Sequence, residues 1–209
     1  MQIFIRRFEN SPVDSNCFLI FNEQKYAIII DPGTQNHDEL YDFIEKENLT
    51  IEYCVITHGH FDHVYGIEDI ISRYNPICIF SNESLLYIQN SKKNLSIFYG
   101  KQFSCNIEKY IAVSEDQYNI NWHGQKIEIY STKGHSDSCI SIKINDDVFV
   151  GDLMINGEKT VTKLPSGNKT MARQSIHKVL NLDGVETVYG GHGDPMTKIE
   201  AENFFLNEN

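Results

Sequence analysis

Histidine and aspartate residues recur in one pattern along this chain, and that pattern constrains the fold more than any other feature. Five of the eight histidines and two aspartates belong to it. Its members are His58, His60, Asp62 and His63 in one short segment, followed by His135, Asp152 and His192. Imidazole and carboxylate groups suit zinc, iron or manganese. The chain is therefore expected to fold so that distant segments bring metal ligands together.

The short segment alone predicts a metal site. In an extended loop His58 and His60 point the same way, because side-chain direction repeats every two residues. Asp62 and His63 follow where the chain turns into a helix, so they can face a second ion. Gly59 leaves room for close approach of the backbone. Three histidines and an acid within six residues would be costly to pack without a shared purpose.

The remaining ligands follow segments with the composition of strands. Apolar, β-branched runs end shortly before His135, Asp152 and His192. Ligands on loops at strand ends converge at one edge, as a centre with two metal ions requires. The predicted ligand set is His58, His60 and His135 for one ion, Asp62, His63 and His192 for the other, and Asp152 between them.

The order of apolar runs predicts a mixed α/β (α+β) chain. Strands are expected at residues 3–8, 17–21, 26–30, 53–56, 77–80, 127–131, 140–144, 148–150 and 185–189. Helices are expected at residues 38–47, 67–73, 83–89, 170–180 and 199–206. Residues 92–106 lack periodicity and are expected to form a surface excursion. This order indicates two sheets with helices outside, in a single domain spanning residues 1–209.

Composition restricts the classes of binding partner and the cellular compartment expected for the chain. A net charge of −11 argues against nucleic acid, because phosphate binding needs a basic surface. No apolar run reaches 18 residues, so no membrane span is expected, and the first residues lack the order of a secretory signal. The five cysteines are scattered without a C-x-x-C pair, which favours a reduced, cytoplasmic protein. The sequence indicates no oligomeric state.

These motifs together resemble the metallo-β-lactamase superfamily. The resemblance covers nearly the whole chain and rests on Asn16-Cys17-Phe18, Asp31-Pro32-Gly33, Thr57-His58-Gly59-His60-Phe61-Asp62-His63, Gly134-His135-Ser136, Gly151-Asp152-Leu153 and Gly191-His192-Gly193-Asp194-Pro195. It implies a four-layer αββα sandwich with metals at one open edge. True zinc β-lactamases lack an aspartate at the position of Asp152, so the chain looks most similar to short glyoxalase II-like hydrolases.

The resemblance also implies an activity and its cofactors. A binuclear hydrolase of this kind cleaves a small-molecule thioester or related acyl ester by attack of a hydroxide that bridges two divalent ions. Zinc is the expected metal, with iron or manganese as alternatives. Asp62 and Asp152 are the expected catalytic residues, Asp62 by orienting the nucleophile while binding metal. Asp31 is expected either to hold a ligand histidine or to serve as a plain turn residue.

Substrate contacts are less well defined by the sequence. Glyoxalase II places a glutathione-holding lysine ten residues after Gly151, where this chain has Val161, and it has a C-terminal helical domain that this chain is expected to lack. Both departures count against S-lactoylglutathione as the substrate. Lys163 is expected either to meet a substrate carboxylate or phosphate or to be plain surface, and Tyr99 either to line the pocket or to pack.

Three other functions stay open on the same scaffold. One is a persulfide dioxygenase-like enzyme with a single iron held by two histidines and an aspartate. Another is a lactonase or phosphodiesterase. The third is a binding protein that keeps metal without turnover, against which the complete ligand set counts.

Overall fold

The computed structural model describes residues 2–206, and the chain divides into two compact units, Met1–Val113 and Ser114–Asn209. Each unit carries one six-stranded sheet with helices packed on it. The predicted mixed α/β class with two sheets is confirmed. The single domain over residues 1–209 stays a prediction.

The sheet of the first unit has both antiparallel and parallel strand pairs. Its strands are β1 (Ile3–Glu9), β2 (Asn16–Asn22), β3 (Tyr26–Ile30), β4 (Thr50–Val55), β5 (Ile77–Ser81) and β6 (Tyr110–Val113), in that spatial order. The pairs β1–β2 and β2–β3 are antiparallel, and β3 to β6 run parallel. Parallel neighbours need crossover connections, and helices supply most of them here.

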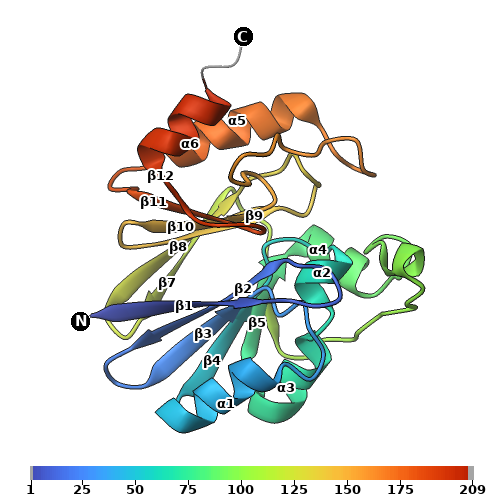
Figure 1. Ribbon diagram of the computed structural model, residues 1–209, viewed down its shortest axis with the longest axis vertical. Helices are drawn as coiled ribbons and strands as arrows, with labels where there is room; N and C mark the ends of the chain where they lie inside the picture. The colour runs from blue at the N-terminus through green and yellow to red at the C-terminus, as the bar shows by residue number, and fades with distance from the viewer. Residues whose placement is uncertain (1, 207–209) are drawn as a thin grey trace. The chain divides into compact units, whose positions relative to one another are not determined.

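The helices of the first unit share one core with its sheet. They are α1 (Asp38–Glu47), α2 (Phe61–Val64), α3 (Ile67–Tyr74), α4 (Asn82–Ile88) and the 3₁₀ turn η1 (Ser96–Tyr99). Figure 1 shows α1 and α3 on the same side of this sheet. Leu40 and Ile44 of α1 and Ile70 of α3 pack in a buried cluster with Ile29 and Cys54 of the strands. This packing supports the sheet. The loops that follow β3 and β4 emerge at its carboxyl edge, where ligands bind in such sheets.

The second unit has a mostly antiparallel sheet. Its strands are β7 (Gln117–Trp122), β8 (Gln125–Ser131), β9 (Ile140–Ile144), β10 (Asp147–Gly151), β11 (Thr187–Gly190) and β12 (Met196–Thr197). Their spatial order reverses the chain order, from β12 to β7, and only β10–β11 is parallel among these pairs. Two-residue turns such as Asn145-Asp146 explain the hairpins; Asn145 takes the left-handed conformation, with φ of 52°.

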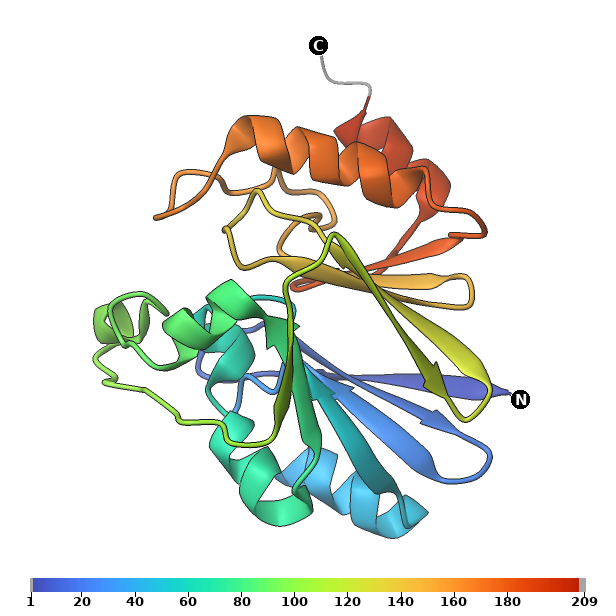
Figure 2. The ribbon, with the colours of Figure 1, turned by 180° about the vertical axis from the view of Figure 1, so that it is seen from behind.

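Two helices cover one face of the second sheet, as Figure 2 shows. They are α5 (Lys169–Leu180) and α6 (Lys198–Phe205). Asn168 caps α5 by accepting a hydrogen bond from the Met171 amide, and Thr197 with Glu200 forms a capping box at α6. Ile176 and Val179 of α5 pack on Val148 and Val150 of β10.

The structure adds strands to the predicted elements and corrects one local expectation. Strands β6 and β7 were not predicted, although exposed residues of β7 alternate with half-buried or buried ones, as in a half-buried strand. Residues 92–106 are more than a surface excursion, because Asn94 and Ser96 are fully buried there. Within residues 2–206, no helix combines the length and the apolar character needed to cross a bilayer.

Candidate metal centre

The histidine segment of the first unit joins β4 to α2. His60 is the N-cap of α2, and the amide of His63 donates to the carbonyl of His60 at 3.1 Å. His58, His60 and His63 are all buried, with 0 to 4 % of each residue exposed. Buried imidazoles are costly unless their nitrogens have polar partners. A Cβ on Gly59 would lie 2.3 Å from the Cβ of Tyr87, so glycine is required for the close approach predicted there.

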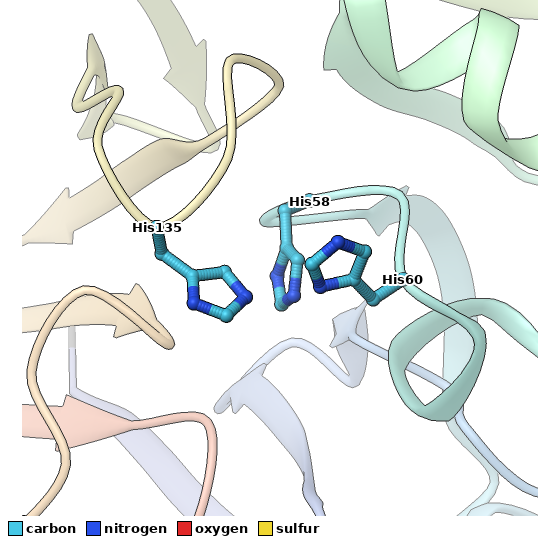
Figure 3. A group of neighbouring side chains, drawn as sticks. All are labelled: His58, His60 and His135. Atoms are coloured by element: carbon cyan, nitrogen blue, oxygen red, sulfur yellow. The ribbon is translucent and has the colours of Figure 1, made fainter. Parts of the chain in front are cut away.

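The three imidazoles converge on each other. The ring centroids of His58 and His60 lie 4.7 Å apart at 81°, and those of His58 and His63 lie 4.2 Å apart at 49°. Figure 3 shows the rings of His58 and His60 side by side. A ligand atom of His58 lies within 4.8 Å of one on His60, and also within 4.8 Å of one on His63.

Asp31 orients this cluster from the end of β3. One of its oxygens, Oδ2, accepts from Nδ1 of His63 at 3.0 Å and from Oγ1 of Thr57 at 2.6 Å. The other accepts from the amide of Thr57 at 2.7 Å. Because the Thr57 hydroxyl donates to Asp31, Nδ1 of His58, 3.1 Å away, is the donor to that hydroxyl. In both histidines Nε2 is then the nitrogen with a lone pair for a metal ion.

The orienting role expected for Asp31 is the one that its contacts support. Asp31 is only 2 % exposed and has φ of 53°, a left-handed conformation that aspartate tolerates better than most residues. Thr57 was not singled out from the sequence, although it stands beside His58. From the sequence, a threonine that bridges two groups by hydrogen bonds looks the same as an ordinary strand residue beside a ligand histidine.

The backbone of Asp62 is held by the first loops of the unit. Oγ of Ser15 donates to the Asp62 carbonyl at 2.5 Å. A Cβ on Gly33 would lie 1.7 Å from that same carbonyl oxygen, so only glycine fits. The side chain of Asn10 accepts from the Gly33 amide at 3.0 Å and donates to the Asp31 carbonyl at 3.1 Å. These contacts place Oδ2 of Asp62 3.5 Å from Nε2 of His63.

The second unit holds the other three predicted ligands, with His135 and His192 on either side of Asp152. Asp152 follows β10, His135 follows β8 and His192 follows β11. Oδ2 of Asp152 lies 3.6 Å from Nε2 of His135, and Oδ1 lies 3.5 Å from Nε2 of His192. Each oxygen of one carboxylate therefore faces a different imidazole.

His135 is fixed by backbone groups. Its Nδ1 lies 2.8 Å from the carbonyl oxygen of Val161, which can only accept, so Nδ1 carries the proton and Nε2 faces Asp152. The preceding Gly134 has φ of 153° and lies so close to Ala172 of α5 that a Cβ would be 2.2 Å from its Cα. From the sequence, Val161 is considered only as a position that could contact substrate. Its contact with His135 is made by the backbone carbonyl, so the identity of its side chain does not predict this role.

The donor set in each unit fits a divalent ion. Ligand atoms bound to one ion at about 2.0–2.2 Å in tetrahedral geometry lie roughly 3.3–3.6 Å apart. The three carboxylate–imidazole separations, 3.5, 3.6 and 3.5 Å, fall within that interval. They exceed the usual length of a hydrogen bond between nitrogen and oxygen.

Comparison with known proteins decides the family. The family model described as "Metallo-beta-lactamase superfamily" matches residues 10–192. The chain belongs to the metallo-β-lactamase superfamily. This confirms the resemblance seen in the motifs and supports a metal-dependent hydrolase.

Two curated relatives of this metallo-β-lactamase superfamily member match it along most of its length. The "Probable metallo-hydrolase YqgX" of Bacillus subtilis (strain 168) is 28 % identical over 97 % of both chains. The "Hydroxyacylglutathione hydrolase GloC" of Haemophilus influenzae is 28 % identical over 92 % of both chains.

Solved structures match the same fold. The BLEG-1 B3 metallo-β-lactamase has a TM-score of 0.88 at 22 % identity, covering 97 % of this chain and 98 % of its own. TTHA1623 in a di-iron-bound form has a TM-score of 0.80 at 20 % identity, covering 96 % and 98 %. At these identities the likeness shows the fold alone, which is the fold of the metallo-β-lactamase superfamily.

Two expected substrate residues of this superfamily member lie in different surroundings. Tyr99 stacks on Phe61 of α2, with ring centroids 5.5 Å apart at 25°, and its residue is 53 % exposed. Burial, followed by the charge of Asp62, raises the pKa of the Tyr99 hydroxyl, which therefore stays protonated at neutral pH. Lys163 is exposed in the loop before α5.

Proposed function

We propose that the protein is a binuclear metal-dependent hydrolase that cleaves a small-molecule thioester or related acyl ester. The observation that carries this proposal is the position of Asp152, whose two oxygens face His135 at 3.6 Å and His192 at 3.5 Å. A carboxylate that bridges two ions gives one oxygen to each. A mononuclear centre does not need this arrangement.

In the proposed centre the two units together supply the ligands. His58, His60 and His135 would hold one ion, Asp62, His63 and His192 would hold the other, and Asp152 would offer one carboxylate oxygen to each. Neither unit alone has the full set, so we propose that residues 1–209 act as one domain. Zinc is the metal we propose, because imidazole predominates among the ligands. Iron is the main alternative, and the neighbour TTHA1623 is described in a di-iron-bound form.

The chain's own groups have defined parts in this reaction. Divalent ions held there would supply a water with a pKa of about 7 and would polarise the substrate carbonyl. Asp31 keeps the proton of His63 on Nδ1, and Val161 does the same for His135 through its carbonyl. Asp62 orients the attacking water through its carboxylate. The protonated Tyr99 hydroxyl offers a donor to the acyl group, and Lys163 offers a cation to a substrate carboxylate or phosphate.

Relatives support a thioester as the substrate class. GloC is named a hydroxyacylglutathione hydrolase and aligns along 92 % of this chain. The absence of a cation at Val161 favours a thiol part other than glutathione. All five cysteines are free and buried, which supports our placement of the protein in a reducing, cytoplasmic compartment.

Metal analysis paired with a thiol-release assay tests the proposal. Protein purified without added metal is expected to contain about two ions per chain and to release thiol from at least one member of a panel of acyl thioesters. Lys163→Ala is expected to raise KM for acidic substrates with little change in kcat, whereas Lys46→Ala, on exposed α1 surface, changes neither. One iron per chain with consumption of oxygen would instead support the dioxygenase-like alternative. If metal-loaded protein cleaves no thioester, lactone or phosphodiester, the result would support the alternative of a binding protein without turnover.

A further inference from the structure

A pocket of about 300 Å³ opens in the second unit, and no residue proposed to bind metal is among the described residues that line it. Its walls are one face of α5, the end of α6 and the segment of residues 159–162. A volume of this size lies at the lower end of those that hold small-molecule ligands. Nothing in the proposed reaction uses it.

Positive charge gathers around this pocket. Lys159, Lys169 and Arg173 all line it, and no acidic side chain is among the described residues that do. The chain as a whole has a net charge of −11. Lys169 begins α5, whose first turn contains no acidic residue. A cation at the positive end of a helix is electrostatically unfavourable, and a bound anion would reverse that cost.

Part of the pocket wall is aromatic. Phe204 and Phe205, near the end of α6, line the pocket with ring centroids 4.9 Å apart at 74°. Ala172 and Ile176 of α5 add aliphatic surface. Lysine and arginine side chains recognise phosphate, and phenylalanine rings offer faces on which a nucleobase stacks. We propose that this pocket binds a nucleoside phosphate, with the phosphates at the cations and the base at the phenylalanines.

The pocket shares its walls with the support of His135. Thr160 and Thr162 line it on either side of Val161, whose carbonyl accepts from Nδ1 of His135. Ala172 lines it as well, and it is the residue against which Gly134 packs. A ligand in the pocket would therefore contact, and reduce the motion of, the two segments that support His135, which are residues 159–162 and the start of α5. Its binding is expected to slow hydrogen exchange of amides in residues 159–163 and 169–173.

Calorimetry on the metal-loaded full chain tests the proposal, with ADP as the probe. ADP is expected to bind with a Kd in the micromolar range, and both adenosine and inorganic diphosphate at least about tenfold more weakly. Arg173→Ala and Lys169→Ala, both at exposed positions, are each expected to weaken ADP binding about five- to tenfold. Phe204→Ala is expected to weaken ADP binding but not diphosphate binding. Lys46→Ala removes the same charge on α1 and is expected to leave binding unchanged.

Three results would overturn the proposal. The first is no binding of ADP at millimolar concentration, and the second is diphosphate binding as tightly as ADP. The third is ADP binding that survives Arg173→Ala but is lost in Asp152→Asn, which would place the phosphates at the metal centre. None of these outcomes depends on thiol release, so the proposed hydrolase activity stands or fails separately.

Discussion

The carboxylate of Asp31 accepts a hydrogen bond from Nδ1 of His63 at 3.0 Å, although the two residues are 32 positions apart in the chain. Both side chains are almost fully buried, at 2 % and 0 % exposed. Thr57 donates to both oxygens of the same carboxylate. Asp31 thereby sets the tautomer of His63 directly and that of His58 through Thr57.

Asp31→Asn is therefore expected to weaken metal binding without removing a ligand. Asparagine tolerates the left-handed backbone at this position, but it is neutral and presents only one acceptor oxygen. Loss of such a partner lowers metal affinity by about 10- to 100-fold. Competition with a chromogenic chelator measures this affinity. Asp42→Asn, on the exposed side of α1, is the control, and equal zinc retention by both variants would contradict the orienting role.

Asp152→Asn tests the bridging carboxylate. Replacing one charged oxygen by an amide nitrogen removes the ligand of one ion while the shape is kept. Metal content is expected to fall from about two ions to at most one per chain, and thiol release to fall by about 100-fold or more. Elemental analysis gives the stoichiometry. Asp183→Asn, an exposed change of the same kind in the second unit, should leave both quantities unaltered; two ions retained in Asp152→Asn would refute the bridge.

Gly33→Ala is expected to damage the centre from a distance. The new Cβ would overlap the Asp62 carbonyl oxygen, 1.7 Å away, so the backbone that carries Asp62 must move. Both metal content and the free energy of unfolding should fall. Gly124→Ala is the control, because its Cβ meets nothing within 4 Å, although its φ of 83° makes alanine cost about 1–2 kcal/mol. Gly124→Ala should lose stability without losing metal, and the same pattern in Gly33→Ala would count against this explanation.

The five cysteines are expected to resist thiol reagents in the folded protein. All are buried, and burial, followed by the charge of Glu68, raises the pKa of Cys105 to about 12. At pH 8 only about one Cys105 thiol in ten thousand is ionised, and the thiolate is the reactive form. Ellman's reagent should detect no fast thiol in native protein and five after denaturation. Rapid reaction of any native cysteine would contradict the burial.

Glu128 is expected to make part of the stability depend on pH. Burial opposes its ionisation, but hydrogen bonds from Lys126 at 2.7 Å and Tyr130 at 3.0 Å outweigh this and lower the pKa of Glu128. Because the folded pKa is lowered, the stabilisation is present above the ordinary value of 4.5 and is lost as pH falls through the folded pKa.

Glu128→Gln should accordingly lower the free energy of unfolding by about 1 kcal/mol at pH 7. The difference from the natural protein should shrink toward zero below about pH 4. Urea denaturation at both pH values measures it. Glu115→Gln, an exposed change nearby in the chain, is expected to have no effect at either pH. A difference that persists at low pH would show a packing effect rather than a charge effect.

The sequence by itself determined the fold class, the family and the candidate ligands. Apolar runs of strand and helix period are local, so they can be read along the chain, as β3, α1 and α5 show. The cluster from His58 to His63 is equally local and pointed to metal without any structure. Strand β7 has an equally local alternation, with Tyr118, Ile120 and Trp122 at every second position, so the sequence contained the signal for it.

Only the tertiary structure decided how these residues are supported. The carbonyl of Val161 orients His135, and backbone groups are the same in every residue type, so no sequence pattern announces them. Asp31 and His63 meet because β3 and β4 are parallel neighbours. Likewise, the two carboxylate oxygens of Asp152 face His135 and His192 because strands of the second sheet pair with one another. Residue type sets which atoms can bind a metal, whereas the pairing of distant strands sets which of them meet.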